Sequence, residues 1–187
     1  MQRCPQTDTQ SVYQHGVSVK DHAFALIQML QSGEAQAGWI LPNWFFQYRQ
    51  DIFNKLFPLD IIEEYTIYHD CGKPYCLTYD DQGKKHFPNH SEISYQTWLT
   101  VGGDTSAAKL IQMDMLIHTI KANDLDEFIK HPEAITLLIS GLAEIHSNAK
   151  MFGGIDSTSF KIKWNQINKR GKAICLKLFG ESNVSID

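Results

Sequence analysis

Apolar residues recur with helical spacing through most of the chain. The first such stripe begins near Ser11, and Ser32-Gly33 predicts its end. Its members lie on one helical face: His15, Val19, His22, Leu26 and Met29. Further helices are predicted over residues 61–71, from 92 onward, over 106–121, briefly after 124, over 135–146 and over about 158–179. These elements predict an all-α protein.

Two of the apolar segments are typical of a protein interior. Aromatic residues gather between positions 36 and 60, where we expect them to build core and a pocket wall. The segment after Pro132 is apolar on nearly every side over residues 135–146, which predicts a central helix. Glu144 lies within that helix. A carboxylate there is costly unless it is paired or bound to a cation.

Chain length and charge limit the possible organisation. With 187 residues, the chain is expected to form one domain over residues 1–187. Its net charge of −4 means that binding to nucleic acid would need a local basic patch. The one dense basic segment lies in a C-terminal helix predicted over about residues 158–179. It is either a solubilising face or a site that captures phosphate groups.

Cysteine usage and the N-terminus suggest a location. The four cysteines form no zinc-binding or CxxC pattern, so we expect reduced thiols. Residues 1–5 contain no apolar run typical of a signal peptide, and no stretch approaches the ~20 apolar residues of a membrane span. The expectation is a cytoplasmic protein without a membrane partner, acting as a monomer or a small homo-oligomer.

The segment from Tyr68 to Pro74 carries the clearest chemical signal. His69 shares a helical face with apolar residues and therefore points inward, and Asp70 follows it directly. Gly72 and Pro74 predict that the helix ends here, which lets adjacent side chains reach one ion. Imidazole and carboxylate together suit a divalent cation, and Lys73 adds a positive charge for a phosphate. The alternative is a capped helix end with a surface lysine.

Other histidines and carboxylates extend this candidate site. We expect His15 to be a ligand and His22 to support it or to pack. His90 lies where a loop meets a helix, a suitable place for a ligand, whereas His86 is expected to be exposed.

A further pair lies in the predicted helix over 106–121. Asp114 and His118 are one turn apart, so they could bind a metal or orient one another. The alternative is a simple hydrogen bond between the two side chains.

The order of these residues resembles the HD-domain metal-dependent phosphohydrolases. Across about residues 12–150, His15, His69-Asp70, His90, His118 and a late carboxylate are similar to the H…HD…H…H…D series of that superfamily. Residues 14–19 resemble its first-helix motif. Residues 69–74 and 86–92 are most similar to the HD domains of bacterial tRNA nucleotidyltransferases and of RNA-end-repair phosphatases.

The resemblance implies a helical bundle with a metal site between helices. One ion would be held by His15, His69, Asp70 and Glu144. The resemblance leaves one or two ions open, and a second ion would share Asp70 and add His90 and His118. The last family ligand is normally an Asp in an Ala-Asp dipeptide, whereas this chain reads Ala143-Glu144. Glu144, Asp114 and His146 all remain open as the last ligand. Imidazole-rich ligation favours Mn, Fe, Co, Ni or Zn.

The implied activity is hydrolysis of a phosphate ester by a metal-activated water. Asp70 and Lys73 would be catalytic, and Lys73, Lys163 and Arg170 would bind phosphate oxygens. The substrate would be a nucleotide or an RNA end carrying a 2′,3′-cyclic, 2′- or nucleoside phosphate.

Three alternatives stay open at this stage. The first is another nucleotide hydrolase: a 5′-deoxynucleotidase, a dNTP triphosphohydrolase or a signalling-nucleotide hydrolase. The second is a non-catalytic, metal-stabilised module that binds RNA or protein. The third is a helical interaction domain whose histidines are core residues, which predicts no metal.

Overall fold

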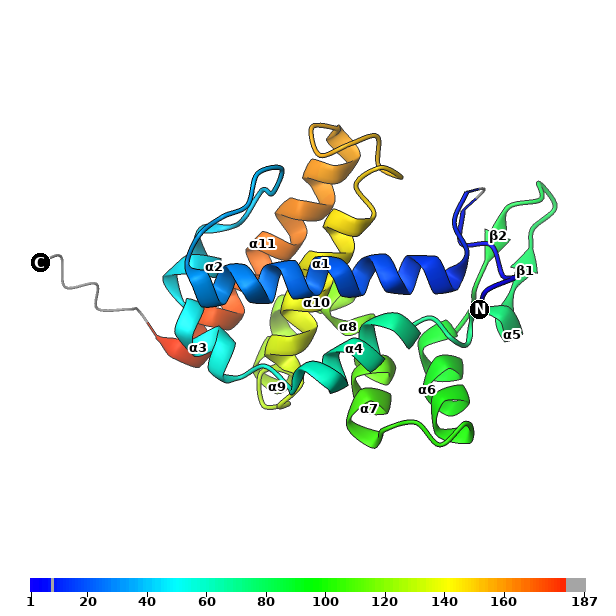
Figure 1. Ribbon diagram of the computed structural model, residues 1–187, viewed down its shortest axis with the longest axis horizontal. Helices are drawn as coiled ribbons and strands as arrows, with labels where there is room; N and C mark the ends of the chain where they lie inside the picture. The colour runs from blue at the N-terminus through cyan, green and yellow to red at the C-terminus, as the bar shows by residue number, and fades with distance from the viewer. Residues whose placement is uncertain (8, 181–187) are drawn as a thin grey trace, which may run out of the picture. The chain divides into compact units, whose positions relative to one another are not determined.

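A computed structural model describes residues 1–7 and 9–180 of the chain (Figure 1). Nearly all regular structure in this part of the chain is helical, which confirms the predicted all-α class. The described residues divide into two compact units, one within 1–21 and 57–116 and the other within 22–56 and 117–180. Helix α1 (Val12–Ser32) contributes residues to both. The prediction of one domain over 1–187 stays a prediction.

The first unit is built from short helices around an apolar centre. Its helices are α4 (Leu59–Tyr68), α5 (Lys73–Cys76), α6 (His90–Thr100) and α7 (Thr105–Met113). Helix α7 packs against α4 and α6 (Figure 1). Helix α5 also packs against α6. Ile62, Tyr65 and Trp98 bury their side chains here, as the apolar spacing predicts. These contacts fix the end of α4, where the His-Asp doublet follows.

A small hairpin interrupts the helices of this unit. Strands β1 (Thr78–Tyr79) and β2 (Lys85–His86) pair antiparallel, with Thr78 opposite His86. The elements predicted from the sequence are all helices and do not include these two strands. Asp80 stabilises the turn, because its side chain accepts hydrogen bonds from the N–H groups of Gln82 and Lys84.

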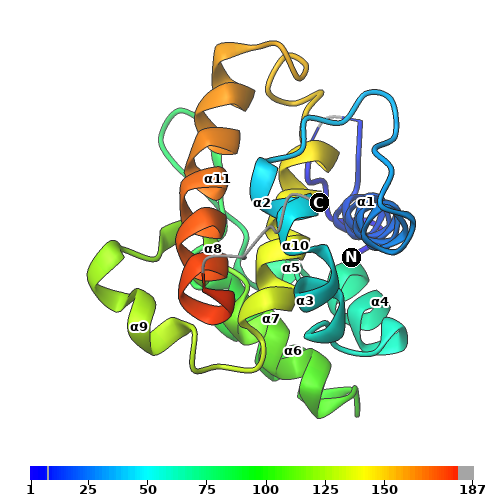
Figure 2. The ribbon, with the colours of Figure 1, turned by 90° about the vertical axis from the view of Figure 1, so that its left-hand side faces the viewer.

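The second unit contains the apolar helix that the sequence predicts to be central. Its elements are α2 (Asn43–Gln47), α3 (Arg49–Asn54), most of α8 (Leu116–Thr119), η1 (Ala122–Asp124), α9 (Leu125–Phe128), α10 (Ala134–Ser147) and α11 (Thr158–Phe179). Nearly every residue of α10 is buried. Helices α10 and α11 lie side by side (Figure 2). The C-terminal helix has the predicted bounds of 158–179.

Two helices begin at residues whose side chains cap the first turn. The Asp104 carboxylate accepts hydrogen bonds from the N–H groups of Ser106 and Ala107, and the Ser157 hydroxyl accepts one from the N–H of Phe160.

The predicted helix over 106–121 is wrong in its extent. Helix α7 ends at Met113, and α8 begins at Leu116. At the break, the N–H of Asp114 donates to the carbonyl of Ile111, three residues back, which tightens the last turn. Spacing by four residues therefore does not place Asp114 and His118 on one helical face.

Among the residues that the structure describes, no helix combines the length and the apolar character that a membrane crossing needs.

Candidate metal centre

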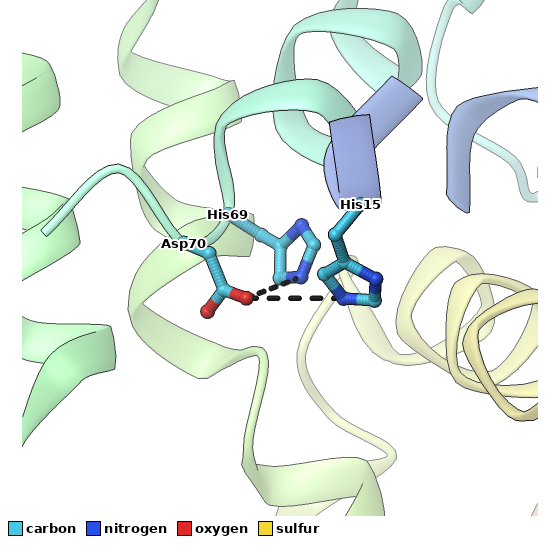
Figure 3. Close-up of side chains that lie close together, drawn as sticks. All are labelled: His15, His69 and Asp70. Atoms are coloured by element: carbon cyan, nitrogen blue, oxygen red, sulfur yellow. Dashed lines mark ion pairs between the residues drawn. The ribbon is translucent and has the colours of Figure 1, made fainter. Parts of the chain in front are cut away.

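The His-Asp doublet lies immediately after α4. The helix ends at Tyr68, earlier than the predicted Cys71, and His69 occupies its C-terminal cap position. Both side chains of the doublet are buried, with His69 3% and Asp70 2% exposed. Because regular helix stops before the doublet, the two neighbouring side chains approach each other (Figure 3). The inward orientation predicted for His69 is confirmed.

His15 reaches the doublet because α1 passes very close to α4. A side chain at Gly16 would place its Cβ 2.0 Å from the carbonyl oxygen of Ile67, so only glycine permits this approach. His15 is fully buried, and its ring lies 5.3 Å from that of His69 in an edge-on arrangement. The inward orientation predicted for His15 is also confirmed.

Three donor atoms converge at this point. The Oδ2 atom of Asp70 lies 3.3 Å from Nε2 of His69 and 3.8 Å from Nε2 of His15 (Figure 3). One ligand atom from each residue lies within 4.8 Å of the other two. Ligands of a single tetrahedral zinc-like ion are about 3.4 Å apart, given metal–ligand distances near 2.1 Å. These three residues could therefore bind one metal ion.

The tautomer of His69 strengthens this fit. Its Nδ1 lies 2.8 Å from the carbonyl oxygen of Thr66, which can only accept, so Nδ1 carries the proton. In a neutral ring, the lone pair is then on Nε2, the atom that faces Asp70. Two acceptors at 3.3 Å repel each other unless a cation or a proton lies between them. A backbone carbonyl that orients a histidine in this way is common beside metals.

His90 approaches the other oxygen of the same carboxylate. Its Nε2 lies 3.7 Å from Oδ1 of Asp70, and its Nδ1 lies 3.1 Å from the carbonyl of Phe87. His90 begins α6, as the sequence predicts, and its side chain is 20% exposed. Asp70 thus has a fully buried side toward His15 and His69, and a more accessible side toward His90.

Lys73 also binds Asp70. Its Nζ lies 2.5 Å from Oδ2 of Asp70 and 3.1 Å from Oε1 of Gln6, with the ring of Phe87 5.2 Å away. Lys73 is buried, so the alternative of a surface lysine is wrong. Its predicted contact with phosphate stays a prediction, and the contact would require Lys73 to exchange one of these partners.

The charge state of Asp70 follows from these neighbours. Burial by itself would raise the pKa of this carboxyl group. With a second proton on the His69 ring, at Nε2, its positive charge, the charge of Lys73, the hydrogen bond from His69 and the charge of His15 outweigh burial and hold the pKa well below its usual range. Asp70 is therefore an ionised carboxylate, the form that binds a cation.

His118 and Glu144 form a separate feature of the second unit. Nε2 of His118 lies 2.9 Å from Oε2 of Glu144, and the two side chains are 23% and 24% exposed. Asn148 donates to the other carboxylate oxygen at 3.5 Å. The sequence requires a partner or a cation for Glu144, and His118 is one such partner. The role of this pair as metal ligands stays a prediction.

Asp114 has a different partner from the one that helical spacing indicates. Its Oδ1 accepts a hydrogen bond from the hydroxyl of Tyr65 at 2.5 Å, and the side chain is buried. This bond joins the end of α7 to α4, the helix that leads into the doublet. Because the helix is interrupted after Met113, the argument that Asp114 and His118 stack one turn apart is wrong.

The remaining candidates lie in the second unit. His22 packs on Trp39, with ring centres 5.4 Å apart. His146 uses both ring nitrogens within the protein: Nδ1 donates to the Leu142 carbonyl at 2.9 Å, and Nε2 accepts from the N–H of Ile40 at 3.4 Å. Burial lowers the pKa of His146. These contacts leave His146 poorly suited to be the last ligand.

The basic helix α11 offers two predicted phosphate ligands. Lys163 is exposed, while Nε of Arg170 donates to the carbonyl of Ile120 at 3.3 Å. Their predicted role toward phosphate remains untested by these contacts.

Three groups around the centre were not predicted. The carbonyls of Thr66 and Phe87 orient His69 and His90, and each lies three residues before its histidine. That spacing could have suggested them. Gln6 is 67 residues from Lys73 along the chain, and no local pattern signals that contact.

The chain matches no protein-family model, and neither a curated protein nor a solved structure is similar enough to count as a match. Any functional assignment therefore depends on the residues and their geometry.

Proposed function

We propose that the protein is a metal-dependent phosphohydrolase of the HD type, acting on a nucleotide or an RNA-end phosphate ester. The observation that carries the proposal is the convergence of His15, His69 and Asp70, whose donor atoms lie within 4.8 Å of one another in a buried site. The order of these residues along the chain, with His90 after them, supports it through the resemblance to the HD series.

Each residue has a chemical task in this proposal. His15 and His69 supply neutral imidazole nitrogens, and Asp70 supplies the negative charge that offsets a divalent ion. The Thr66 carbonyl holds His69 in the tautomer that presents Nε2. When bound, a transition-metal ion (Mn, Fe, Co, Ni or Zn) supplies Lewis acidity that activates water near neutral pH. The side chains of His90 and Lys73, which also lie against Asp70, are 20% and 10% exposed. His90 would be a ligand of a second ion, and Lys73 would contact the substrate phosphate.

The proposed substrate is one with a terminal or cyclic phosphate, such as a 2′,3′-cyclic, 2′- or nucleoside phosphate. Lys73, which lies 2.5 Å from Asp70, would supply positive charge for a non-bridging oxygen of the substrate phosphate. A 5′-deoxynucleotidase, a dNTP triphosphohydrolase and a signalling-nucleotide hydrolase share the same machinery and are separated by the substrate screen below.

The experiment combines metal analysis with a phosphate-release screen. The purified chain is analysed for bound transition metals and assayed with bis-p-nitrophenyl phosphate, dNTPs, nucleoside 5′-monophosphates and 2′,3′-cyclic nucleotides in Mn, Co, Ni and Zn. We expect bound metal and turnover in the native chain, with both lost in His69→Ala. The matched control is His86→Ala, which removes an exposed histidine that also contacts a carboxylate, Asp80, at 2.9 Å. Equal loss in both variants would contradict the proposal.

Burial of the donors favours a second candidate, a metal site that only stabilises the fold. His15, His69 and Asp70 are each 3% exposed or less, and structural metal sites take all their ligands from protein. This candidate is a non-catalytic module that binds RNA or a partner protein. Bound metal without turnover on any substrate would favour it, whereas absence of both would leave a plain helical domain.

A further inference from the structure

The second unit contains a cleft of about 800 Å³ between α2 and α11. Three aromatic side chains line it: Trp44 from α2, Tyr48 from the position directly after α2, and Trp164 from α11. Sites for small organic molecules typically have volumes of about 300–1,000 Å³ and aromatic walls. The cleft therefore has the size and the lining of a ligand site.

The aromatic rings are held in place by their own polar atoms. Nε1 of Trp44 donates to the carbonyl of Asn168 at 3.2 Å, and Nε1 of Trp164 donates to the carbonyl of Ile40 at 2.6 Å. The hydroxyl of Tyr48 donates to the carbonyl of Gly180 at 2.9 Å. These bonds use the polar atoms of the rings internally. Trp44 and Tyr48 are 3% and 5% exposed, so the half-buried Trp164 offers most of the ring surface to the cleft.

Tight packing fixes the floor of the cleft. At Gly171, an added Cβ would lie 2.4 Å from ring atoms of Trp44, so α11 rests directly on that indole. Gly171 and Trp44 are both buried. Because these side chains are already fixed, little conformational entropy is lost when a flat molecule binds over them.

The rim of the cleft is polar and carries a positive charge. Asn43, Gln47 and Asn168 add amide groups, and Lys172 adds an ammonium group. Of the described residues that line the cleft, Lys172 is the one with a charge, and no carboxylate is among them. Ring surface, amides and one ammonium are complementary to a flat molecule with one negative group.

We infer that this cleft is a binding site for an aromatic acid, a small planar molecule that bears a single anionic group. The ring lies against Trp164 and the floor formed by Trp44. The anionic group faces Lys172, and the amides at the rim take the remaining polar atoms. This site is independent of the proposed metal centre, because every residue that carries it belongs to the second unit.

The test uses a matched pair of probes, 2-naphthoate and the neutral 2-naphthamide, with the full chain. Binding is measured by isothermal titration calorimetry and by saturation-transfer NMR. We expect naphthoate to bind more tightly than naphthamide. Lys172→Gln should weaken naphthoate about fivefold, the effect of one partly exposed charge contact, and leave naphthamide unchanged.

Two further variants keep the test decisive. Lys169→Gln removes the same charge from an exposed position of α11 outside the cleft lining and should leave both affinities unchanged. Asn168→Trp fills the cleft and should weaken both probes more than about tenfold at unchanged helical content by circular dichroism. The inference is overturned if neither probe binds the native chain, or if Lys172→Gln and Lys169→Gln have equal effects on naphthoate.

Discussion

Two histidine–carboxylate arrangements in this chain differ in burial and in the number of groups they gather. In the first unit, Asp70 is 2% exposed, and His15, His69, His90 and Lys73 all lie within 4 Å of its oxygens. In the second unit, Glu144 is 24% exposed and has His118 at 2.9 Å. A partly exposed pair can share its charge with water, whereas a buried carboxylate needs several compensating groups. Convergence on Asp70 is therefore the stronger indication of a cation site.

Two lysine–carboxylate pairs show the same contrast at matched geometry. Lys73–Asp70 and Lys130–Glu127 are both spaced by three residues, with distances of 2.5 and 2.6 Å. The side chains of the first pair are 10% and 2% exposed, and those of the second are 69% and 71% exposed. Distance alone does not distinguish them. Burial determines how much free energy is lost when one partner is removed.

The largest expected effect comes from replacing the carboxylate in each of the two arrangements, Asp70 in the first unit and Glu144 in the second. If the proposed function is correct, Asp70→Asn should reduce metal affinity and turnover by at least about 100-fold, because it removes the negative charge that would hold the ion. Glu144→Gln should change both by less than about tenfold, since water can replace a partly exposed carboxylate. Metal content by elemental analysis and phosphate release measure the two effects. Equal losses would place Glu144 among the ligands, as the order of residues in the sequence indicates.

The second prediction concerns the close approach of α1 to α4. Gly16→Ala should lower the free energy of unfolding by about 3 kcal/mol or more, because its Cβ would meet the backbone oxygen of Ile67 at 2.0 Å. Urea unfolding followed by circular dichroism measures the change. Gln31→Ala, an exposed position in the same helix, should change stability by less than about 0.5 kcal/mol. Unchanged stability in Gly16→Ala would contradict the close approach.

The third prediction sharpens the comparison of the two lysines. Lys73→Met should destabilise the metal-free protein by about 3 kcal/mol, because it leaves the buried charge of Asp70 with fewer compensating groups. Added metal should recover much of this loss, since it replaces the missing positive charge. Lys130→Met should cost less than about 1 kcal/mol with or without metal. Thermal or urea unfolding with and without Zn or Mn tests all four cases, and similar costs for the two lysines would argue against the role of burial.

The smallest expected effect is a dependence of stability on alkaline pH. Burial raises the pKa of the Cys71 thiol in the first unit to about 11 and that of Cys175 in the second to about 12. In the unfolded chain these thiols ionise near pH 8.5, so the unfolded state loses protons first. Their contribution is complete below that pH and is lost as the pH rises toward the folded values.

The urea midpoint should therefore be lower at about pH 10 than at about pH 8. Cys175→Ala should reduce this decrease, and Cys71→Ala should also reduce it, while lysine and tyrosine titration remains common to all variants. A decrease of the same size in the native chain and in both variants would show that the thiols do not contribute.

The predicted helices agree with the structure wherever local sequence carries the signal. The stripe through His15, Val19 and Leu26 forms α1, and the apolar segment after Pro132 forms the buried helix α10. Helix α11 spans Thr158–Phe179, in agreement with the predicted bounds of about 158–179, and Ser157 caps its start. The break between α7 and α8 was missed because no glycine or proline marks it.

The candidate site was predictable in part. His69 and Asp70 are adjacent in sequence, and the helix end beside them is signalled by Gly72 and Pro74. The burial of Lys73, by contrast, had no local signal, because its partner Gln6 is distant along the chain. The break after Met113 gave Asp114 a partner in Tyr65 that spacing could not indicate.

The sequence by itself determined the helical class, the bounds of the strongest helices and the identity of the histidines and carboxylates. These depend on periodicity and capping, which act over a few residues. Only the tertiary structure decided which of those groups meet. The close approach of α1 to Ile67 at Gly16 places His15 beside His69 and Asp70, and Lys73 is buried by residues distant in sequence. Such contacts depend on packing between segments far apart in the chain, which local periodicity does not encode.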